Sequence, residues 1–151
     1  MNATQFLTKI NRFQIALGGL AVFFGAVGFY LARDIDFQAA VGVETGFPTY
    51  ELHMMPFNRF GAILVALVGV IGLAAGLIRK PSVGYVASAA SLLLALQVIV
   101  QWRDKQANAL GSAGQNLSFD LLLAIGFAVT ALLARSAPQL GSDPEPGRNG
   151  P

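Results

Sequence analysis

Four apolar runs, each close to the length needed to cross a lipid bilayer, dominate this chain of 151 residues. The runs are 13–32, 60–78, 81–102 and 117–134. An α-helix rises about 1.5 Å per residue, so about 20 residues cross the roughly 30 Å hydrocarbon core. The predicted fold class is therefore all-α, an integral membrane bundle of four transmembrane helices.

The composition leaves little room for a soluble body. Hydrophobic residues make up 54% of the chain and charged residues 12%, about half the charged fraction of a typical soluble domain. We assign residues 1–135 to the transmembrane domain. Residues 136–151 are rich in proline and glycine and lack aromatic residues, so we expect a disordered cytoplasmic tail.

Several function classes are excluded or disfavoured by residue content. The chain has no cysteine, which excludes disulfides, cysteine-based zinc sites, iron–sulfur clusters and thiol catalysis. It has no Gly-x-Ser-x-Gly or comparable nucleophile motif. The net charge is +2, but the basic residues stand at the ends of apolar runs, where they anchor to headgroups rather than bind nucleic acid. We therefore expect no enzymatic activity, no cofactor and no nucleic-acid partner.

The basic residues favour an orientation with both termini in the cytoplasm. In that orientation the inside segments carry Lys9, Arg12, Arg79, Lys80, Arg135 and Arg148, and the outside loops carry Arg33, Arg59, Arg103 and Lys105. The short, doubly basic turn between the second and third runs is the strongest local signal. Arginine exceeds lysine, and alanine and glycine are abundant, a usage typical of GC-rich bacteria, so we expect a multi-pass protein of the bacterial inner membrane.

Small residues recur at helical spacing in all four runs. Close packing of small residues drives helix association in lipid, so these stripes are predicted helix-packing surfaces. The stripes comprise Gly18, Ala21, Gly25 and Gly28; Gly69, Gly72 and Gly76; Gly84, Ser88, Ser91 and Ala95; and Gly126 with Thr130. They serve either packing within one bundle or contact between one stripe and a partner subunit.

Three polar residues within or near the runs are candidate ligand-binding residues. Gln97 and Gln101 share one helix face, and Asp120 is the only acid within a predicted span. A structural interpretation assigns the glutamines to interhelical hydrogen bonds and Asp120 to the start of a helix capped by Asn116 or Ser118. The functional alternative is contact with a quinone carbonyl or a lipid headgroup.

The first outer loop, 33–59, is the longest segment predicted outside the membrane. It contains Phe37, Phe47, Tyr50 and Phe57, and loops of this length are often functional. Within it, His53, Met54 and Met55 combine ligand types that suit copper(I). The cluster has no second histidine and no cysteine, so we expect no metal site and interpret the methionines as an interfacial segment.

The arrangement of spans and loops resembles a family of small four-span bacterial membrane proteins of unknown function, common in actinobacteria. In that family a long outer loop ends in Asn-Pro-Leu-His and leads into a glycine-rich second span. Here Asn58 precedes Phe60-Gly61, and Gly69 and Gly72 follow; the second outer loop contains Ala107-Asn108 and Asn116. The family's histidines near the outer ends of spans two and four are absent, and Gly61, Val65 and Phe119 stand near those places. The resemblance implies a fold, but it does not indicate any activity.

These observations lead to one main functional hypothesis. We expect a non-enzymatic accessory or structural subunit of a larger bacterial membrane complex of respiratory or transport type. Its partners would be membrane lipids and other integral membrane subunits, or further copies of the chain. The alternatives are a small ligand-binding protein that holds a quinone or lipid near Gln97, Gln101 and Asp120, and a membrane immunity or exclusion factor.

Overall fold

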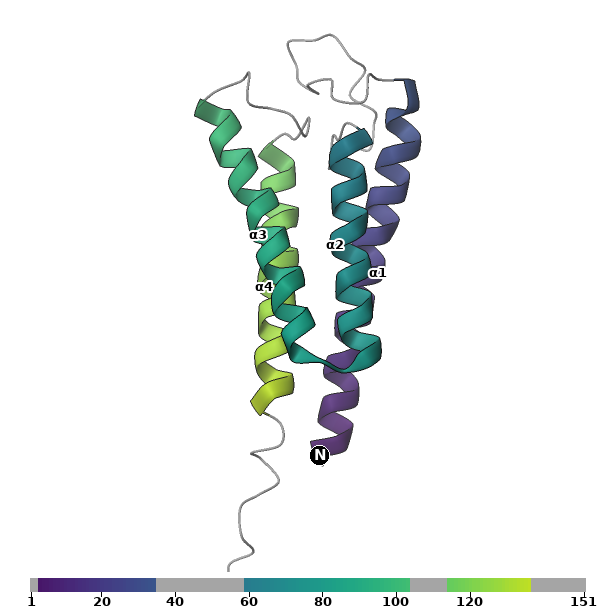
Figure 1. Ribbon diagram of the computed structural model, residues 1–151, viewed down its shortest axis with the longest axis vertical. Coiled ribbons are helices and arrows are strands. Elements are labelled where there is room, and N and C mark those ends of the chain that lie inside the picture. The colour runs from purple at the N-terminus through teal and green to yellow at the C-terminus, as the bar shows by residue number, and fades with distance from the viewer. Residues whose placement is uncertain (1–2, 35–58, 104–113, 137–151) are drawn as a thin grey trace, which may run out of the picture.

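The computed structural model describes residues 3–34, 59–103 and 114–136. The described elements are α1 (Ala3–Leu31) with a short 3-10 turn η1 (Ala32–Asp34), α2 (Arg59–Ile78), α3 (Pro81–Arg103) and α4 (Gly114–Ser136) (Figure 1). All four α-helices are long and apolar enough to cross a membrane. The described part of the chain contains no strand, so the predicted all-α class with four apolar spans is confirmed.

Two helices extend beyond the apolar runs that predicted them. Helix α1 begins at Ala3, ten residues before the predicted start at Phe13, and α4 covers Gly114–Ser136 rather than 117–134. A hydropathy pattern detects only the apolar part of a helix. The helical conformation itself can extend further, into flanking polar residues. Because α4 begins at Gly114, Asn116 and Ser118 lie inside its first turns, and the prediction that either residue caps this helix is wrong.

The helices form two antiparallel pairs that lie side by side. Helix α1 packs most extensively against α2, and α3 against α4, while contacts between the two pairs are fewer. The start of α1, the α2–α3 turn and the end of α4 lie at one end of the bundle, the lower end in Figure 1. We call this the basal end. The opposite end carries η1 and the start of α4.

Helices α1 and α2 approach so closely that glycine is required between them. A Cβ atom placed on Gly69 would lie 2.7 Å from the Gly18 carbonyl oxygen, and one placed on Gly25 would lie 2.7 Å from the Ala62 carbonyl oxygen. Backbone atoms cannot move aside as a flexible side chain can. The small residues therefore allow direct backbone contact along most of this pair.

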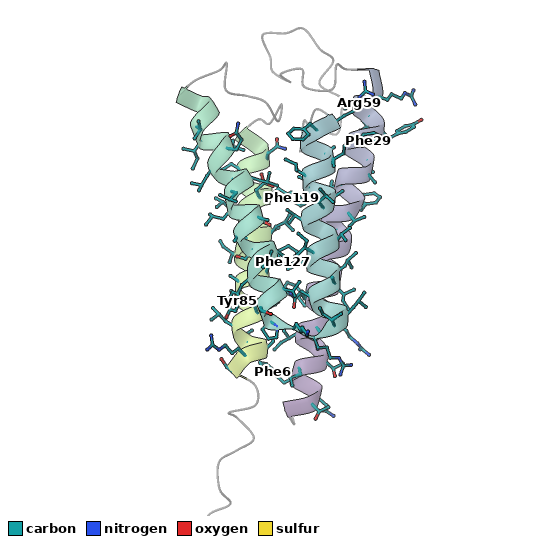
Figure 2. All side chains as sticks on the ribbon, viewed as in Figure 1. Phe6, Phe29, Arg59, Tyr85, Phe119 and Phe127 are labelled. Carbon is teal, nitrogen blue, oxygen red and sulfur yellow. The ribbon has the colours of Figure 1, made fainter. Side chains whose placement is uncertain are left out.

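The two pairs join by inserting large side chains above glycines. Phe127 of α4 lies over Gly72 of α2, and Leu17 of α1 lies over Gly126 of α4. Figure 2 shows Phe127 directed into the centre of the bundle, where it is fully buried together with Leu123. The glycines thus form notches that admit bulky neighbours between helices of different pairs.

The α3–α4 pair is joined by a hydrogen bond as well as by packing. The Ser88 hydroxyl donates to the Ala124 carbonyl oxygen at 2.7 Å. Ser91 is also fully buried, but its hydroxyl donates back to the Ala87 carbonyl oxygen of its own helix at 2.9 Å. Of the two serines in the predicted stripe, Ser88 is therefore the one whose hydroxyl bonds to the neighbouring helix.

The remaining small residues of the predicted stripes have varied surroundings. A Cβ atom on Gly76 would lie 2.7 Å from Ile15 Cγ1 of α1, and one on Gly84 would lie 2.6 Å from Gln14 Nε2. Gly28 is half-buried. Most of the glycines singled out in the sequence thus contact other helices of the same chain.

The turn between α2 and α3 ends one helix and begins the next within two residues. Arg79 adopts a left-handed conformation with φ of 55°, and the Lys80 amide donates to the Ala75 carbonyl oxygen at 3.3 Å. This is the bonding of a Schellman C-cap. The Val83 amide then donates to the Lys80 carbonyl oxygen at 3.1 Å, and Pro81 occupies the first position of α3, where its missing N–H has no cost.

Candidate functional sites

Asp120 carries a deeply buried carboxyl group. It lies in the first half of α4 and is 3% exposed, and Asn116, one turn earlier, is 1% exposed. Within the described residues, Asp120 Oδ1 is buried without a hydrogen-bond partner. Buried polar atoms in proteins nearly always have a partner, so this oxygen marks Asp120 as a candidate contact for a ligand or a second chain.

The two candidate glutamines lie on α3, the helix that packs against α4. Gln97 is half-buried, and Gln101 follows one turn later, near the end of the helix. Both are in the half of α3 that lies beside the start of α4, because the two helices are antiparallel (Figure 1). The structure therefore places all three candidate ligand-binding residues in the same half of the α3–α4 pair.

Aromatic side chains lie next to this polar region. The Phe24 ring of α1 and the Phe119 ring of α4 meet edge to face, with ring centroids 5.2 Å apart. Phe23 continues the cluster, with its centroid 5.7 Å from that of Phe24. Phe119 is buried and precedes Asp120 in the chain, so this aromatic cluster lies at the same level of the bundle as the buried carboxyl group.

The weak metal candidates His53, Met54 and Met55 lie outside the described residues, as does most of the outer loop, 35–58. Likewise the tail 137–151 lies outside them. Within helices α1 to α4 and η1, no group of three or more histidine, cysteine, aspartate or glutamate side chains is placed to hold a metal ion.

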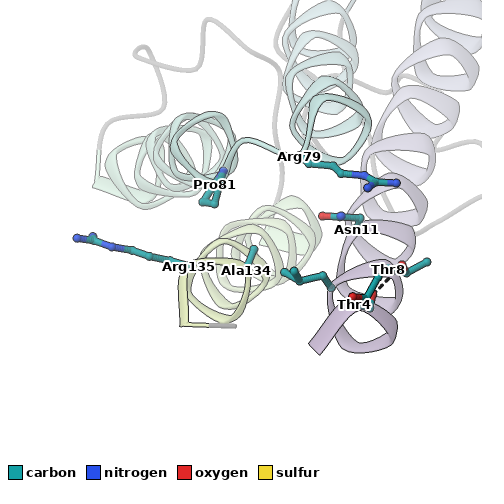
Figure 3. A pocket seen from close by; sticks show the side chains of 8 residues that line it. Thr4, Thr8, Asn11, Arg79, Pro81, Ala134 and Arg135 are labelled. Atoms are coloured by element: carbon teal, nitrogen blue, oxygen red, sulfur yellow. Dashed lines mark hydrogen bonds between the residues drawn. The ribbon is translucent and has the colours of Figure 1, made fainter. Parts of the chain in front are cut away.

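The structure also contains a cavity at the basal end, with apolar, polar and basic residues in its lining, that sequence reasoning missed. It has a volume of about 410 Å³ and lies between α1, the start of α3 and the end of α4 (Figure 3). We call it the basal cavity. Its lining consists of Thr4, Leu7, Thr8 and Asn11 of α1, Arg79 and Pro81 of the α2–α3 turn, and Ala134 and Arg135 of α4.

A spacing pattern could have revealed the α1 wall of this cavity. Thr4, Thr8, Asn11 and Gln14 follow one another at intervals of four, three and three residues, which places them on one helix face. Residues 3–12 precede the apolar run, so hydropathy alone does not extend the predicted helix to them. The deepest member, Gln14, is 2% exposed, and its side-chain nitrogen has no hydrogen-bond partner within the described residues.

The sequence and the fold were compared with known proteins. No protein-family model matches the chain, and neither the curated proteins nor the solved structures contain a match to it.

Proposed function

We propose that this chain is a non-enzymatic accessory subunit of a larger membrane complex in the bacterial inner membrane, with both termini in the cytoplasm. The surface of α3 is the observation that supports this proposal best. Val86, Leu93, Leu96 and Val100 are all more than two-fifths exposed on α3. With the exposed Ala89, they follow the alternating three- and four-residue spacing of a helix-pairing seam.

The neighbouring helix α4 continues this aliphatic surface. Its outward side chains Leu122, Ile125, Val129 and Leu132 follow the same spacing. In contrast, α1 presents large aromatic side chains outward, namely Phe13, Phe23, Phe29 and Tyr30. Aliphatic side chains at this spacing interdigitate with a partner helix crossing at about 20°, which supports the α3–α4 side as the contact with another subunit.

The test is purification of the tagged protein, expressed at its native level, in a gentle detergent, followed by native-gel sizing and mass spectrometry. We expect a stoichiometric complex in which other membrane subunits accompany this chain. Replacing Leu93 and Leu96 with alanine removes two central side chains of the seam and should release the chain from that complex.

The matched control replaces Leu20 and Phe23, which face outward on α1, with alanine. This variant should remain in the complex. A wild-type chain that purifies only as a monomer or homo-oligomer would contradict the proposal, as would equal loss of the complex in both double variants.

A second candidate function is supported by Asp120. Its buried Oδ1 has no hydrogen-bond partner within the described residues, and the Phe24–Phe119 pair lies at the same level of the bundle. Aromatic side chains with a few polar groups are typical of small-molecule sites. The ligand class would be a quinone or a similar apolar molecule with a hydrogen-bonding head.

The experiment compares Asp120→Asn with Ser118→Ala, which alters an exposed hydroxyl on the same part of α4. We expect lipid extracts of wild type and Ser118→Ala to contain a stoichiometric quinone, and extracts of Asp120→Asn to lack it. If no quinone accompanies the wild-type protein, or if Asp120→Asn retains it, the second function fails.

A further inference from the structure

The basal cavity has a volume typical of small-ligand sites. Its volume of about 410 Å³ falls within the range of roughly 300–1,000 Å³ that is usual for ligand pockets. Three helices contribute to its wall, so a ligand there would touch both helix pairs. Figure 3 shows Asn11 pointing from α1 into the space bordered by Pro81 and Ala134.

Within the part of the chain that the structure describes, the charges around the cavity are of one sign. Arg79 and Arg135 line it, and Lys9, Arg12 and Lys80 are exposed at the same end of the bundle. The acids within the described residues, Asp34 and Asp120, both lie in the opposite half. In Figure 3 the Arg79 side chain extends over α1 on the side of Asn11, whereas Arg135 extends outward from α4. The charges that the described residues place around the cavity are therefore positive, and Arg79 is the arginine on the side of Asn11.

Hydrogen-bonding side chains of α1 lie in the wall of the cavity and one helical turn further into the bundle. The Thr8 hydroxyl donates to the Thr4 carbonyl oxygen at 2.9 Å, which leaves the Thr8 oxygen as an acceptor, and the Asn11 amide can donate. One turn deeper, a Cβ atom on Gly84 would lie 2.6 Å from Gln14 Nε2 and 3.1 Å from the Ala131 side chain.

These three residues continue the three walls of the cavity. Gln14 lies three residues beyond Asn11, Gly84 three beyond Pro81, and Ala131 three before Ala134. Gln14 is not among the residues that line the cavity, and its buried side-chain nitrogen has no partner within the described residues. The Asn11 amide and the two arginines of the lining are hydrogen-bond donors, and donors of this kind match an anionic group with several oxygen acceptors.

The cavity opens at the level where the apolar helices end. The membrane-crossing segments begin at Thr4 and Pro81 and end at Ile78 and Ser136, so the cavity lies at headgroup depth. Its apolar lining, Leu7, Pro81 and Ala134, can contact the glycerol and upper acyl region of a lipid. Basic pockets between transmembrane helices are known to bind anionic lipid headgroups.

We propose that the basal cavity binds a phosphate group, with Arg79 and Asn11 as its principal contacts. The apolar lining and the depth favour an anionic phospholipid as the molecule that carries this phosphate. A soluble phosphate compound offers the same chemistry, and the two sources are distinguished below.

The test uses the full-length protein in detergent, titrated with phosphatidylglycerol or with phosphatidylcholine of the same acyl chains, and bound lipid is counted by native mass spectrometry. Arg79→Gly removes the charge while keeping a residue that suits the left-handed backbone at this position. We expect it to weaken phosphatidylglycerol binding about fivefold. Asn11→Ala should weaken binding about tenfold, as loss of a hydrogen bond to a charged group does.

Lys9→Gln is the matched control, because Lys9 is a basic residue of α1 that is exposed and lies outside the cavity lining. It should change binding less than twofold. Preference for phosphatidylglycerol that survives millimolar inorganic phosphate identifies the lipid headgroup. Displacement of the lipid by inorganic phosphate, or a phosphate-induced thermal stabilisation that Arg79→Gly lacks, supports the same phosphate site with a soluble ligand.

Two results would overturn the proposal. One is equal binding of both lipids together with no response to inorganic phosphate. The other is that Lys9→Gln weakens binding as much as Arg79→Gly, since this would show a general attraction to the basic surface rather than a site in the cavity.

Discussion

Arg79 has a left-handed backbone conformation, which residues other than glycine rarely adopt. Its φ of 55° allows the chain to leave α2 and enter α3 within two residues, and the Lys80–Ala75 hydrogen bond closes the helix end. A left-handed conformation costs a residue with a side chain about 1–2 kcal/mol. Glycine avoids this cost but loses more entropy on folding, by about 0.5–1 kcal/mol.

We therefore predict that Arg79→Gly keeps or raises the stability of the bundle, by up to about 1.5 kcal/mol. The measurement is reversible unfolding of the purified protein by SDS in mixed micelles. Lys80→Gly, one residue later, is the control and should give no stabilisation. A loss of stability in Arg79→Gly larger than that in Lys80→Gly would contradict the assignment of a left-handed cap at residue 79.

Individual residues also show what sequence reasoning could detect. Asp120 was recognisable because an acid within an apolar run is rare, and the structure places it in the interior of the bundle. Gln14 was missed although it is equally buried. It lies near the start of an apolar run with charged residues just before it, and only the helix that begins at Ala3 shows that its face continues the polar stripe of α1.

At the level of helices, the glycine residues differ in what surrounds them. Gly69 faces the backbone of α1, with the Val22 amide nitrogen 2.6 Å from the place its Cβ atom would occupy, whereas a Cβ atom on Gly19 would meet nothing within 4 Å. Sequence spacing identified Gly18, Gly25, Gly69 and Gly72 as packing residues, but it could not assign the helix that each contacts. That assignment depends on the rotation of each helix about its axis.

Alanine substitution at Gly69 and at Gly19 separates the effect of helix packing on stability from the effect of helix propensity. Gly69→Ala should destabilise the bundle by about 1–3 kcal/mol, because its methyl group collides with backbone atoms. Gly19→Ala should be neutral or stabilising by about 0.5–1 kcal/mol, because alanine favours a helix. SDS unfolding of both variants, beside wild type, provides the comparison. Equal effects of the two substitutions would mean that α1 and α2 do not approach as closely as described.

At the scale of the whole molecule, the four helices and their order followed from the apolar runs alone, because the length of a bilayer span leaves little freedom. Helix α1 packs mainly against α2, and α3 against α4, although the shortest connection in the chain joins α2 to α3. The basal cavity could not be predicted in the same way. It requires Asn11, Pro81 and Ala134, which are distant in sequence, to meet at one end, and this depends on how the two pairs are placed against each other.

The central claim is that the chain crosses the membrane four times, with the start of α1, the α2–α3 turn and the end of α4 on one side. Because the chain contains no cysteine, single cysteines at Thr4, Lys80, Ser136 and Arg33 can each be labelled with a membrane-impermeant thiol reagent in intact and in inverted membrane vesicles. We predict that Thr4→Cys, Lys80→Cys and Ser136→Cys react only from the cytoplasmic face, and Arg33→Cys only from the opposite face. Reaction of Arg33→Cys from the same face as Lys80→Cys would contradict the four-span arrangement.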